Sequence, residues 1–367
     1  MPFLSGWTKE KLITIPAAYI TGSMVDFPLT VQIANDAQIG AAARADGYDI
    51  RFTLADGTTL LSYERESFAI AAGLASGIFH VKAPSLTSGV DATIYCQYGK
   101  ADAADGQAAT AAWDSYFAGV WHFGSASVLS LLDSTINDND ATMVDSIAAV
   151  AGKLGGGADF GNQTGHFTLP NSASLNITGP WTISGWSYWT GGAGGAYNEI
   201  YGRWTSTGPK GFGLCRSSPN GYTMADSYNN SGVGIIGTTA PGAAWTHLAG
   251  SCTGNSGLLS VFVNAVSEKT PVACNAPGNT AVGALIGNNS AYGAGSRRWK
   301  GYLDEVRVSN VARTLAWLAL EYNCVANQAG VVTWGAEQSA VTPVFGGRIL
   351  NRSGSVQRFG GRILQRL

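Results

Sequence analysis

The chain has 367 residues, of which 45% are hydrophobic and 13% charged, and 49 of them are glycine. This length accommodates two domains with sizeable cores, and the composition favours short strands joined by tight turns over helical bundles. A formal net charge of −2 excludes a strong overall field that would attract nucleic acid or anionic lipid. No stretch of about 18 apolar residues predicts a membrane span, and the first residues do not resemble a secretory signal.

The first part of the chain, residues 1–100, predicts a small β-sandwich domain. Apolar and polar side chains alternate in residues 27–33, which is typical of a half-buried strand. Asp56-Gly57 stands between two strand-like runs and predicts a hairpin, because glycine tolerates positive φ. The Ala-rich residues 34–46 predict a short helix. The predicted strands cover residues 11–15, 27–33, 49–54, 60–68, 77–82 and 92–98.

A second strand-rich region follows an Ala-rich connector, residues 101–117, which we expect to be partly helical. The strand spacing and turn density of residues 118–337 favour an antiparallel sandwich. A helix is predicted over residues 315–322. The fold class is therefore all-β, with two antiparallel β-sandwich domains. The clearest strands of the second domain are predicted at 181–186, 245–250, 258–264 and 302–308.

The five cysteines are widely spaced and include no CxxC pair, so they do not predict a cysteine-bound metal site. We expect buried, reduced thiols. A disulfide between Cys215 and Cys252, or between Cys252 and Cys274, remains an alternative. The other two cysteines are Cys96 and Cys324.

The last segment, residues 338–367, is a basic tail that contains a short repeat. Phe345-Gly-Gly-Arg-Ile-Leu-Asn-Arg352 recurs as Phe359-Gly-Gly-Arg-Ile-Leu-Gln-Arg366, and no acidic side chain occurs after residue 340. Such a repeat suits docking onto a partner by strand addition, with arginine pairing to carboxylates. Contact with nucleic acid and a flexible tail are the alternatives. The predicted docking residues are Phe345, Arg348, Ile349, Phe359, Arg362 and Ile363.

Several motifs of residues 118–337 occur in the order typical of one family. The segments are Gly119–Phe123, Asp133–Asp140, Gly152–Gly155, Ala158–Gly161, Trp181–Trp186, Trp245–Ala249, Val261–Asn264 and Gly301–Val308. With these segments the region resembles the laminin-G-like, concanavalin-A-like family of jelly rolls. The resemblance implies a jelly-roll sandwich and binding of a ligand or partner.

Residues 7–98 are similar to a small β domain of unknown function that precedes laminin-G-like domains in phage and bacterial surface proteins. The matching segments are Asp26–Leu29, Asp49–Thr53, Asp56–Glu64 and Tyr95–Gly99, and Val332–Glu337 matches the way such chains end. This resemblance implies surface display without naming a ligand.

The family's fold also occurs in glycosidases, so the carboxylates were weighed as a catalytic pair. Retaining glycosidases need two carboxyl groups about 5 Å apart, and no Glu-x-Asp-x-x-Glu pattern occurs. Asp304 and Glu305 are adjacent, so a regular strand would point them to opposite faces. Glu64 and Glu66 share a face, which we interpret as solvated. The four histidines stand singly among apolar residues and are interpreted as structural. We therefore expect no catalysis.

Members of the resembled family often hold Ca²⁺, and the Asp133–Asp140 loop has oxygen-rich side chains that suit this ion. Asp133 and Asp304 fall on the family's motif positions and are the candidate ligands. The alternative is a turn in which these side chains cap their own backbone.

Aromatic residues in segments rich in glycine and asparagine are the candidates for sugar contacts, and contact with neighbouring subunits is the equal alternative. These residues are Trp189, Tyr197, Tyr201, Trp204 and Tyr228.

Together these features predict a virion protein, such as a decoration, tail or fibre component, assembled in the host cytoplasm. Its tail would anchor it to other virion proteins, and its lectin-like domain would contact host glycan or neighbouring copies. A glycan-active hydrolase or a free secreted lectin is the alternative.

Overall fold

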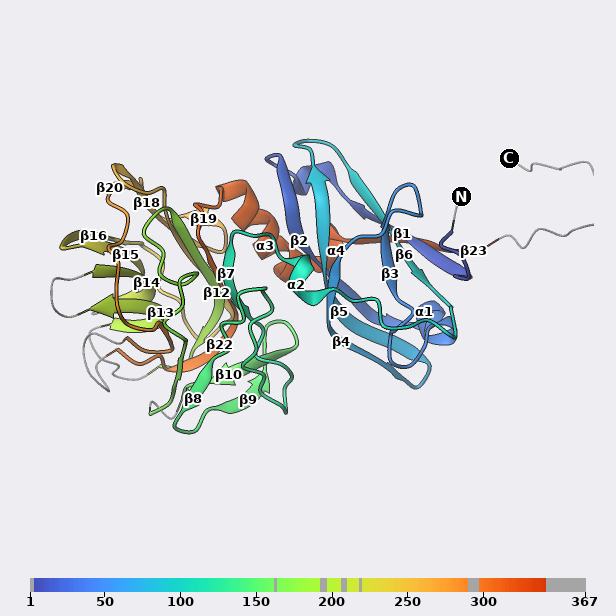
Figure 1. Cartoon of the computed structure of the whole chain (residues 1–367), viewed down its shortest axis with the longest axis horizontal. Helices are drawn as coiled ribbons and strands as arrows, with labels where there is room; N and C mark the ends of the chain where they lie inside the picture. The colour runs from blue at the N-terminus through green and yellow to red at the C-terminus, as the bar shows by residue number, and fades with distance from the viewer. Residues whose placement is uncertain are drawn as a thin grey trace, which may run out of the picture.

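Two β-sandwich units follow one another along the long axis of the molecule, with helix α3 between them (Figure 1). The computed structural model describes residues 3–161, 164–191, 197–205, 210–217, 220–289 and 297–340. The expected all-β, antiparallel fold class is confirmed. Among the described residues, no helix has the length and apolar character needed to cross a bilayer.

The N-terminal unit packs a four-stranded sheet, in the order β23-β1-β6-β3, against a three-stranded sheet, in the order β2-β5-β4. The strand predicted at residues 27–33 is confirmed and Phe27, Leu29, Val31 and Ile33 are buried, but Thr30 is buried too, so the expectation of a half-buried strand was wrong for this part of β2. The strands are β1 (Lys9–Ile15), β2 (Met24–Asp36), β3 (Arg51–Leu54), β4 (Tyr63–Ala71), β5 (Leu74–Leu86), β6 (Ala92–Tyr98) and β23 (Thr333–Ser339). The short helices are η1 (Ala17–Tyr19), α1 (Ala37–Ala42) and α2 (Ala109–Ala112).

The hairpin expected at Asp56-Gly57 is only partly formed. The turn exists, since the Asp56 carboxylate accepts hydrogen bonds from the amides of Thr58 and Thr59, but a single bridge, Thr53 to Leu60, continues it. β3 then pairs with β6, whereas β4 pairs with β5 in the other sheet. The prediction of two directly paired strands was wrong, because the chain uses this turn to cross between the sheets of the sandwich.

The end of the described chain returns to its beginning. β23 pairs antiparallel with β1, from Lys9 opposite Ser339 to Thr14 opposite Thr333. The segment 333–337, placed by the sequence analysis in the second domain, therefore forms part of the N-terminal sheet. In sequence order, the jelly roll is therefore inserted between β6 and β23 of the N-terminal sheet.

The jelly roll packs a nine-stranded sheet against a seven-stranded sheet. The first has the order β19-β18-β17-β12-β22-β10-β9, with β20 beside β18 and β7 beside β22. The second has the order β16-β15-β14-β13-β21-β11-β8. The strands of the first sheet are β7 (Phe117–Trp121), β9 (Ala148–Ala151), β10 (Gly156–Asp159), β12 (Trp181–Trp189), β17 (Thr246–Cys252), β18 (Gly257–Val263), β19 (Val266–Ser267), β20 (Val272–Cys274) and β22 (Gly301–Ser309).

The seven-stranded sheet consists of β8 (Thr142–Val144), β11 (His166–Thr168), β13 (Tyr197–Thr205), β14 (Lys210–Ser217), β15 (Thr223–Asn229), β16 (Ser231–Ile236) and β21 (Leu285–Ile286). Between the sheets lies one apolar core that includes Trp121, Trp181 and Trp299, all fully buried. The four strands predicted most clearly for this domain correspond to β12, β17, β18 and β22. Burial of this aromatic core is the main stabilising contribution to the sandwich.

Helix α3 (Leu315–Ala326) joins the two units, and α4 (Gln328–Val331) follows it. Trp317, Leu320 and Cys324 belong to the core of the N-terminal unit, whereas Leu318 and Val325 pack against the jelly roll. A helix that buries several of its sides is apolar nearly all round, as this sequence is. The helix predicted at 315–322 is confirmed and extends one turn further.

All five cysteines are buried and unbonded. The Sγ atoms of Cys252 and Cys274 lie 2.9 Å apart in the jelly roll, while Cys215 takes no part in this pair. The expected burial of the cysteines is confirmed, and of the two alternative disulfide pairs only Cys252–Cys274 has its sulfur atoms side by side.

Candidate functional site

The five aromatic residues expected in loops lie in strands instead, so that placement was wrong. Trp189 ends β12, Tyr197, Tyr201 and Trp204 belong to β13, and Tyr228 belongs to β15. Trp189 and Tyr201 are part of the apolar core and are 6% and 0% exposed, and Trp204, on the other face of its strand, is also only 5% exposed, so none of these three presents an open ring to a ligand. Glycine and asparagine in these segments concealed the strand pattern from the sequence analysis.

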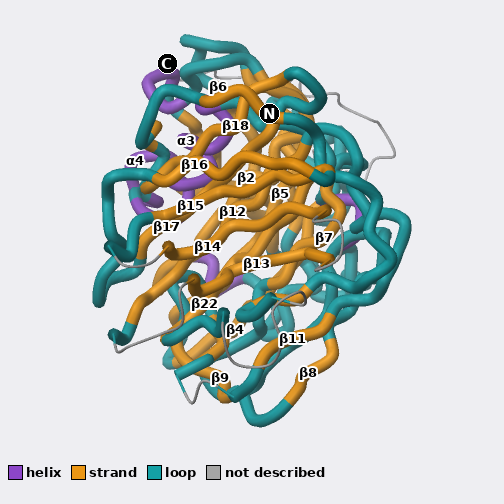
Figure 2. Tube along the Cα trace, turned by 90° about the vertical axis from the view of Figure 1, so that its left-hand side faces the viewer, coloured by secondary structure: helices purple, strands orange, loops and turns teal. Residues whose placement is uncertain are grey.

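The other three aromatic residues lie on the seven-stranded sheet. Opposed residues of antiparallel strands point to the same face. Tyr201 lies opposite Leu214, and both side chains point into the core. Trp204 is three residues further along β13, so its side chain points to the opposite, outer face of the sheet. On that face it lies in one row with Gly211 of β14 and Tyr228 of β15. The rings of Trp204 and Tyr228 meet edge to face at 5.2 Å. Figure 2 shows β13, β14 and β15 on the side of the jelly roll farthest from the N-terminal unit. We call this surface the distal face.

Two carboxyl groups, those of Glu199 and Asp226, lie on the distal face beside these rings. They are 0% and 3% exposed, and Glu199 Oε2 and Asp226 Oδ1 have no hydrogen-bond partner among the described residues. A Cβ atom added to Gly213 would lie 3.2 Å from Glu199 Oε2 and 3.0 Å from Trp204 Nε1. Glycine at this position therefore lets both large side chains lie over the sheet.

Burial determines the ionisation of these two groups. It raises the pKa of Glu199 to about 7, although Arg297 and Asn289 favour the charged form. Burial, together with the charge of Glu199, raises the pKa of Asp226 well above its ordinary value. The amide of Asn289 donates to Glu199 Oε1 at 2.8 Å, and the Arg297 guanidinium lies over the Tyr197 ring at 4.3 Å. The distal face thus combines protonated carboxyls, an amide, a guanidinium and aromatic rings.

The two predicted metal ligands do not form one site. Both oxygens of Asp133 accept hydrogen bonds within its own loop, from the amides of Val120, Thr135 and Asn139 and from the Thr135 hydroxyl. This is the self-capping turn that the sequence analysis gave as the alternative. Asp304 Oδ2 accepts from the amide of Leu154 instead, and burial, with the charge of Glu305, raises the pKa of Asp304 well above its ordinary value.

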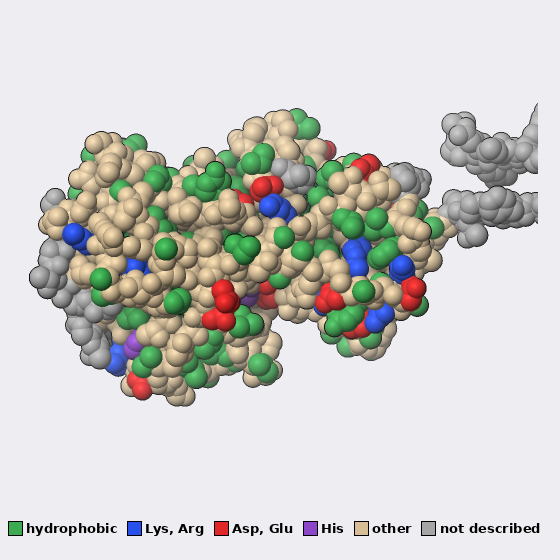
Figure 3. All heavy atoms as spheres, in the orientation of Figure 1, with side chains coloured by type: hydrophobic (Ala, Val, Ile, Leu, Met, Phe, Trp, Pro, Cys, Tyr) green, Lys and Arg blue, Asp and Glu red, His purple; other side chains and the backbone are tan. Residues whose placement is uncertain are grey.

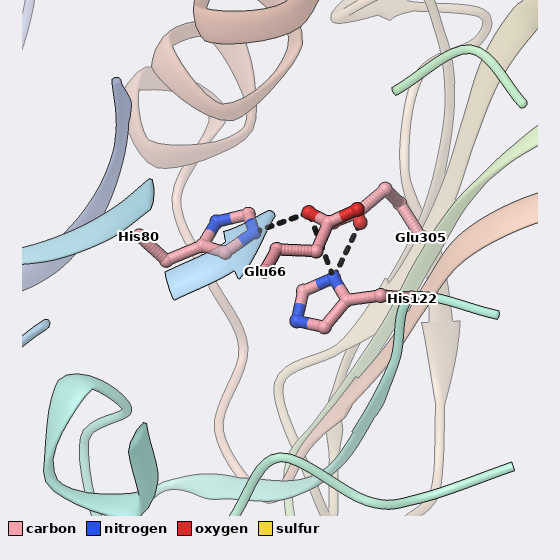
Figure 4. Close-up of side chains that lie close together, drawn as sticks. All are labelled: Glu66, His80, His122 and Glu305. Carbon is pink, nitrogen blue, oxygen red and sulfur yellow. Dashed lines mark hydrogen bonds and ion pairs between the residues drawn. The ribbon is translucent and has the colours of Figure 1, made fainter. Parts of the chain in front are cut away.

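A different group of acidic and imidazole side chains meets at the junction of the two units (Figure 4). Glu66, His80, His122 and Glu305 each offer one ligand atom, and these atoms lie within 4.8 Å of one another. We call this set the junction cluster. His80 Nε2 lies 3.0 Å from Glu66 Oε2, His122 Nδ1 bonds to Glu305, and the two imidazole rings stack at 4.5 Å. Figure 3 shows acidic side chains near this junction and few charged side chains over the jelly-roll face in view.

Irregular backbone aims both carboxylates of the junction cluster. The register of β4 with β5 shifts between Arg65 and Ser67, so Glu66 is an extra, bulged residue. The register of β22 with β12 shifts in the same way around Glu305, whose φ is 52°. Bulges redirect side chains, and a left-handed non-glycine residue stores strain that is often associated with function. This is why Asp304 and Glu305 do not follow the alternation assumed from sequence.

The two histidines come from different units. His80 lies on β5 of the N-terminal unit. His122 follows β7, where Trp121 and Phe123 point into the jelly-roll core and Val120 points into the N-terminal core. His122 therefore faces the N-terminal unit by the same alternation.

A wider network surrounds the junction cluster and neutralises much of its charge. Glu64 accepts hydrogen bonds from Trp113 and Ser134, both at 2.7 Å, and its carboxylate lies 3.5 Å from His122 Nε2. Arg307 donates to Glu305 at 2.5 Å and lies 3.6 Å from Glu321. Glu321, on α3, also pairs with His247 Nε2 at 3.1 Å and accepts from Ser184.

The ionisation of this network follows from burial and from opposite charge. Burial disfavours charge on Glu64, yet His122 outweighs it and lowers the pKa of Glu64 to about 2. Burial likewise disfavours the charged form of His122, but Glu305 and Glu64 raise its pKa well above the ordinary value. For Glu66, burial dominates and raises the pKa. The cluster thus mixes charged and neutral acids in one buried space.

The sequence analysis missed this cluster. Glu64 and Glu66 were interpreted as a solvated strand face, but their side chains are only 12% and 5% exposed. His80, His122 and His247 were interpreted as isolated structural groups, and they share one network. The sequence signal was the pairing of Glu64 and Glu66 on one face, but only packing of the two units brings His122 and Glu305 to them.

Face-to-face antiparallel sheets with this strand order define a concanavalin-A-like jelly roll. Residues 160–319 match the family described as the concanavalin A-like lectin/glucanases superfamily, and residues 46–123 match a domain of unknown function, DUF2341. The chain thus carries a laminin-G-like, concanavalin-A-like domain preceded by this domain of unknown function, as the resemblance predicted. No curated protein matches the chain.

Solved structures offer distant likenesses. One is domain 4 of AbnA, a GH43 extracellular arabinanase from Geobacillus stearothermophilus, in complex with arabinotriose. It is 21% identical to this chain with a TM-score of 0.44, and the match covers 55% of this chain and 96% of the AbnA domain. The binding domain of Paraclostridial Mosquitocidal Protein 1 has 11% identity and a TM-score of 0.47, covering 58% of this chain and 53% of its own. A structure of botulinum neurotoxin type C, titled for cell entry dependent on two ganglioside molecules, has 11% identity and a TM-score of 0.42, covering 55% and 51%. This chain spans about half the length of the two toxin chains, and none of these likenesses assigns it a ligand.

The predicted docking residues of the tail, Phe345, Arg348, Ile349, Phe359, Arg362 and Ile363, lie outside the described residues.

Proposed function

We propose that this chain is a glycan-binding display protein of a virion, without catalytic activity, and that the distal face contacts host-surface glycan. The observation that carries the proposal is the half-buried ring of Tyr228, which lies against Trp204 and beside Glu199 and Asp226, two buried carboxyls that each have one oxygen without a hydrogen-bond partner among the described residues. A buried polar atom without a partner is costly and calls for an explanation. A sugar hydroxyl would satisfy such atoms, and an aromatic ring suits the apolar face of a sugar ring.

The position of the distal face supports display. It lies at the end of the molecule away from the N-terminal unit (Figures 1 and 2). The N-terminal unit and the arginine-rich tail would then attach to other virion proteins, leaving the distal face toward the host. The lectin-like family of residues 160–319 suits this role.

A direct test measures binding of the intact chain to a panel of glycans, followed by the affinity of Tyr228→Ala for any glycan found. Tyr228 is half-buried on the distal face, so we expect an affinity loss of about tenfold or more. Tyr302→Ala is the matched control, since Tyr302 is also half-buried but stacks on Tyr188 on the other sheet. No glycan bound, or equal losses in both variants, contradicts the proposal.

Glycan hydrolysis is the second candidate, favoured by the two carboxyls that share the distal face. Both known geometries of glycoside hydrolysis need one ionised carboxylate beside one acid. Burial raises the pKa of both groups, that of Glu199 to about 7, so Asp226 suits the acid and Glu199 is the group that could be ionised near neutral pH. Release of reducing sugar ends by the intact chain, lost in Glu199→Gln, would establish hydrolysis instead.

Attachment through the tail is tested by removing residues 341–367 and measuring incorporation into particles. We expect incorporation to be lost while the far-ultraviolet circular dichroism of the purified chain stays unchanged. Unchanged incorporation would exclude the tail as the anchor. A double variant, Arg348→Ala with Arg362→Ala, changes the same arginine in both repeats without shortening the chain. It tests whether these two side chains are needed for incorporation.

A further inference from the structure

We propose that Glu66, His80, His122 and Glu305 bind one divalent transition-metal ion, with Zn²⁺ as its representative, at the junction of the two units. Imidazole nitrogens and carboxylate oxygens are ligands that this class of ion accepts. The four ligand atoms lie within 4.8 Å of one another. In a tetrahedral Zn²⁺ shell with ligands at about 2.0–2.2 Å, two ligand atoms are about 3.4 Å apart, so side-chain shifts of about 1 Å would form the shell.

The far nitrogen of each imidazole already has a partner that would fix its orientation. His80 Nδ1 lies 3.3 Å from the Thr30 hydroxyl, which leaves Nε2 toward Glu66. His122 Nε2 lies 3.5 Å from the Glu64 carboxylate, an ion-pair contact without a hydrogen bond among the described residues, and Nδ1 points toward Glu305. Metal-bound histidines nearly always have such a partner on the second nitrogen, because it sets the tautomer and strengthens the ligand.

An unpartnered atom provides an independent indication. The Glu66 side chain is 5% exposed, and its Oε1 has no hydrogen-bond partner among the described residues. Its other oxygen lies between the two imidazoles, 3.0 Å from His80 Nε2 and 3.9 Å from His122 Nδ1 (Figure 4). Oε2 of Glu66 is thus within reach of a cation shared by the two imidazoles, and the bulge in β4 places it there, whereas Oε1 lies toward Gly155.

The carboxylates around this space already have partners, since Glu305 pairs with Arg307 and His122, and Glu64 lies 3.5 Å from His122 Nε2. A divalent ion would take over the pairing of Glu66 and Glu305. Buried charges are stable only when paired or bound to metal. A divalent ion with two carboxylates and two neutral imidazoles forms a neutral shell.

Each unit supplies half of the proposed shell. Glu66 and His80 come from the N-terminal unit, and His122 and Glu305 come from the nine-stranded sheet of the jelly roll. The ion would therefore hold the two units in one orientation. Binding to the folded state alone would also raise the stability of the chain.

The test uses the full chain without a polyhistidine tag, stripped by chelator and titrated calorimetrically with Zn²⁺. We expect about one equivalent to bind, and Glu66→Gln to lose affinity by at least tenfold, with Glu64→Gln losing about 10–100-fold as an outer partner. His166→Gln is the control, because His166 lies on β11 in the other sheet. Less than about half an equivalent bound, or equal affinity in Glu66→Gln, overturns the proposal.

A second measurement protects the test against a variant that fails to fold. X-ray absorption of the unmutated chain loaded with one equivalent of Zn²⁺ reports the ligands directly. The proposal requires scattering from two imidazoles with only nitrogen and oxygen in the first shell. Fewer imidazoles, or sulfur from a cysteine, overturns it whatever the variants do.

Discussion

The two sheets of the jelly roll turn outward to very different surroundings. The outer face of the nine-stranded sheet is covered by α3 and the N-terminal unit, and its charged groups join a network from His80 to His247 in which most groups face an opposite charge. On the distal face of the seven-stranded sheet, among the described residues, Glu199 faces one cation, Arg297, and Asp226 faces none within ion-pair distance. Opposite charge therefore lowers the pKa of Glu321 on the first face, whereas burial raises the pKa of Glu199 on the second. The contrast indicates structure on one side and recognition on the other.

The largest effect that should distinguish the two faces is loss of Arg307. Arg307→Ala leaves Glu305 and Glu321 buried without their shared guanidinium. Removing one partner of a buried ion pair costs about 3–5 kcal/mol, measured as the free energy of unfolding in urea. Lys82→Ala is the control, since its pair with Asp26, at 3.5 Å, is partly exposed and should contribute little. Equal losses would show that the network contributes no more than a surface pair.

Acid should weaken the covered face. Burial disfavours charge on Glu321, but Arg307 and His247 outweigh it and lower its pKa to about 2, from an ordinary value of 4.5. Its contribution is therefore present above pH 4.5 and is lost as the pH falls toward 2, on the order of 3 kcal/mol. Unfolding measured from pH 6 to pH 3 should show a shallower decline in Glu321→Gln than in the unmutated chain. Parallel curves would contradict this.

Alkali should weaken the distal face, with the opposite sign. Burial raises the pKa of Glu199 to about 7, so stability is complete below pH 4.5 and is lost as the pH rises through 7. Glu199→Gln should therefore be more stable than the unmutated chain at pH 8, on the order of 2 kcal/mol, with no gain at pH 4.5. Glu268→Gln, where the carboxylate accepts from the amides of Thr238 and Thr239, should give no gain at either pH.

The smallest effect concerns how α3 is held over the nine-stranded sheet. The Thr314 hydroxyl caps α3 by accepting from the Trp317 amide at 3.2 Å. Thr314→Ala should cost about 1 kcal/mol in the free energy of unfolding. Trp317 itself packs on Phe27 and Phe117, so a much larger loss on removing the cap would mean that α3 depends on local capping more than on packing.

The elements could be predicted where local pattern decides them. Alternation in residues 27–33 predicted part of β2, the Trp181–Trp186 motif predicted β12, and the apolar run at 315–322 predicted α3. The pattern failed where glycine replaced the alternating side chains, as around Trp204 and Tyr228. The hairpin prediction at Asp56-Gly57 also failed, because turn residues do not determine whether the two flanking strands pair with each other or with other strands.

The candidate sites were less predictable than the fold. Trp204 and Tyr228 were correctly grouped, although Glu199 and Asp226 beside them were not recognised. Asp133 satisfies its own loop, and Asp304 lies next to the junction cluster without being among its four ligands. Residues far apart in the chain make each site, and sequence spacing contains little information about such contacts.

By itself, the sequence determined that this is a two-part β protein with a laminin-G-like second domain, because strand period, turn residues and motif order are local properties. Only the tertiary structure decided that the last strand completes the first sheet, that two bulges aim Glu66 and Glu305 at the same space, and that three of the four histidines share one network. Those outcomes depend on how sheets pack and how backbone irregularities redirect side chains, and both are set by contacts between distant residues.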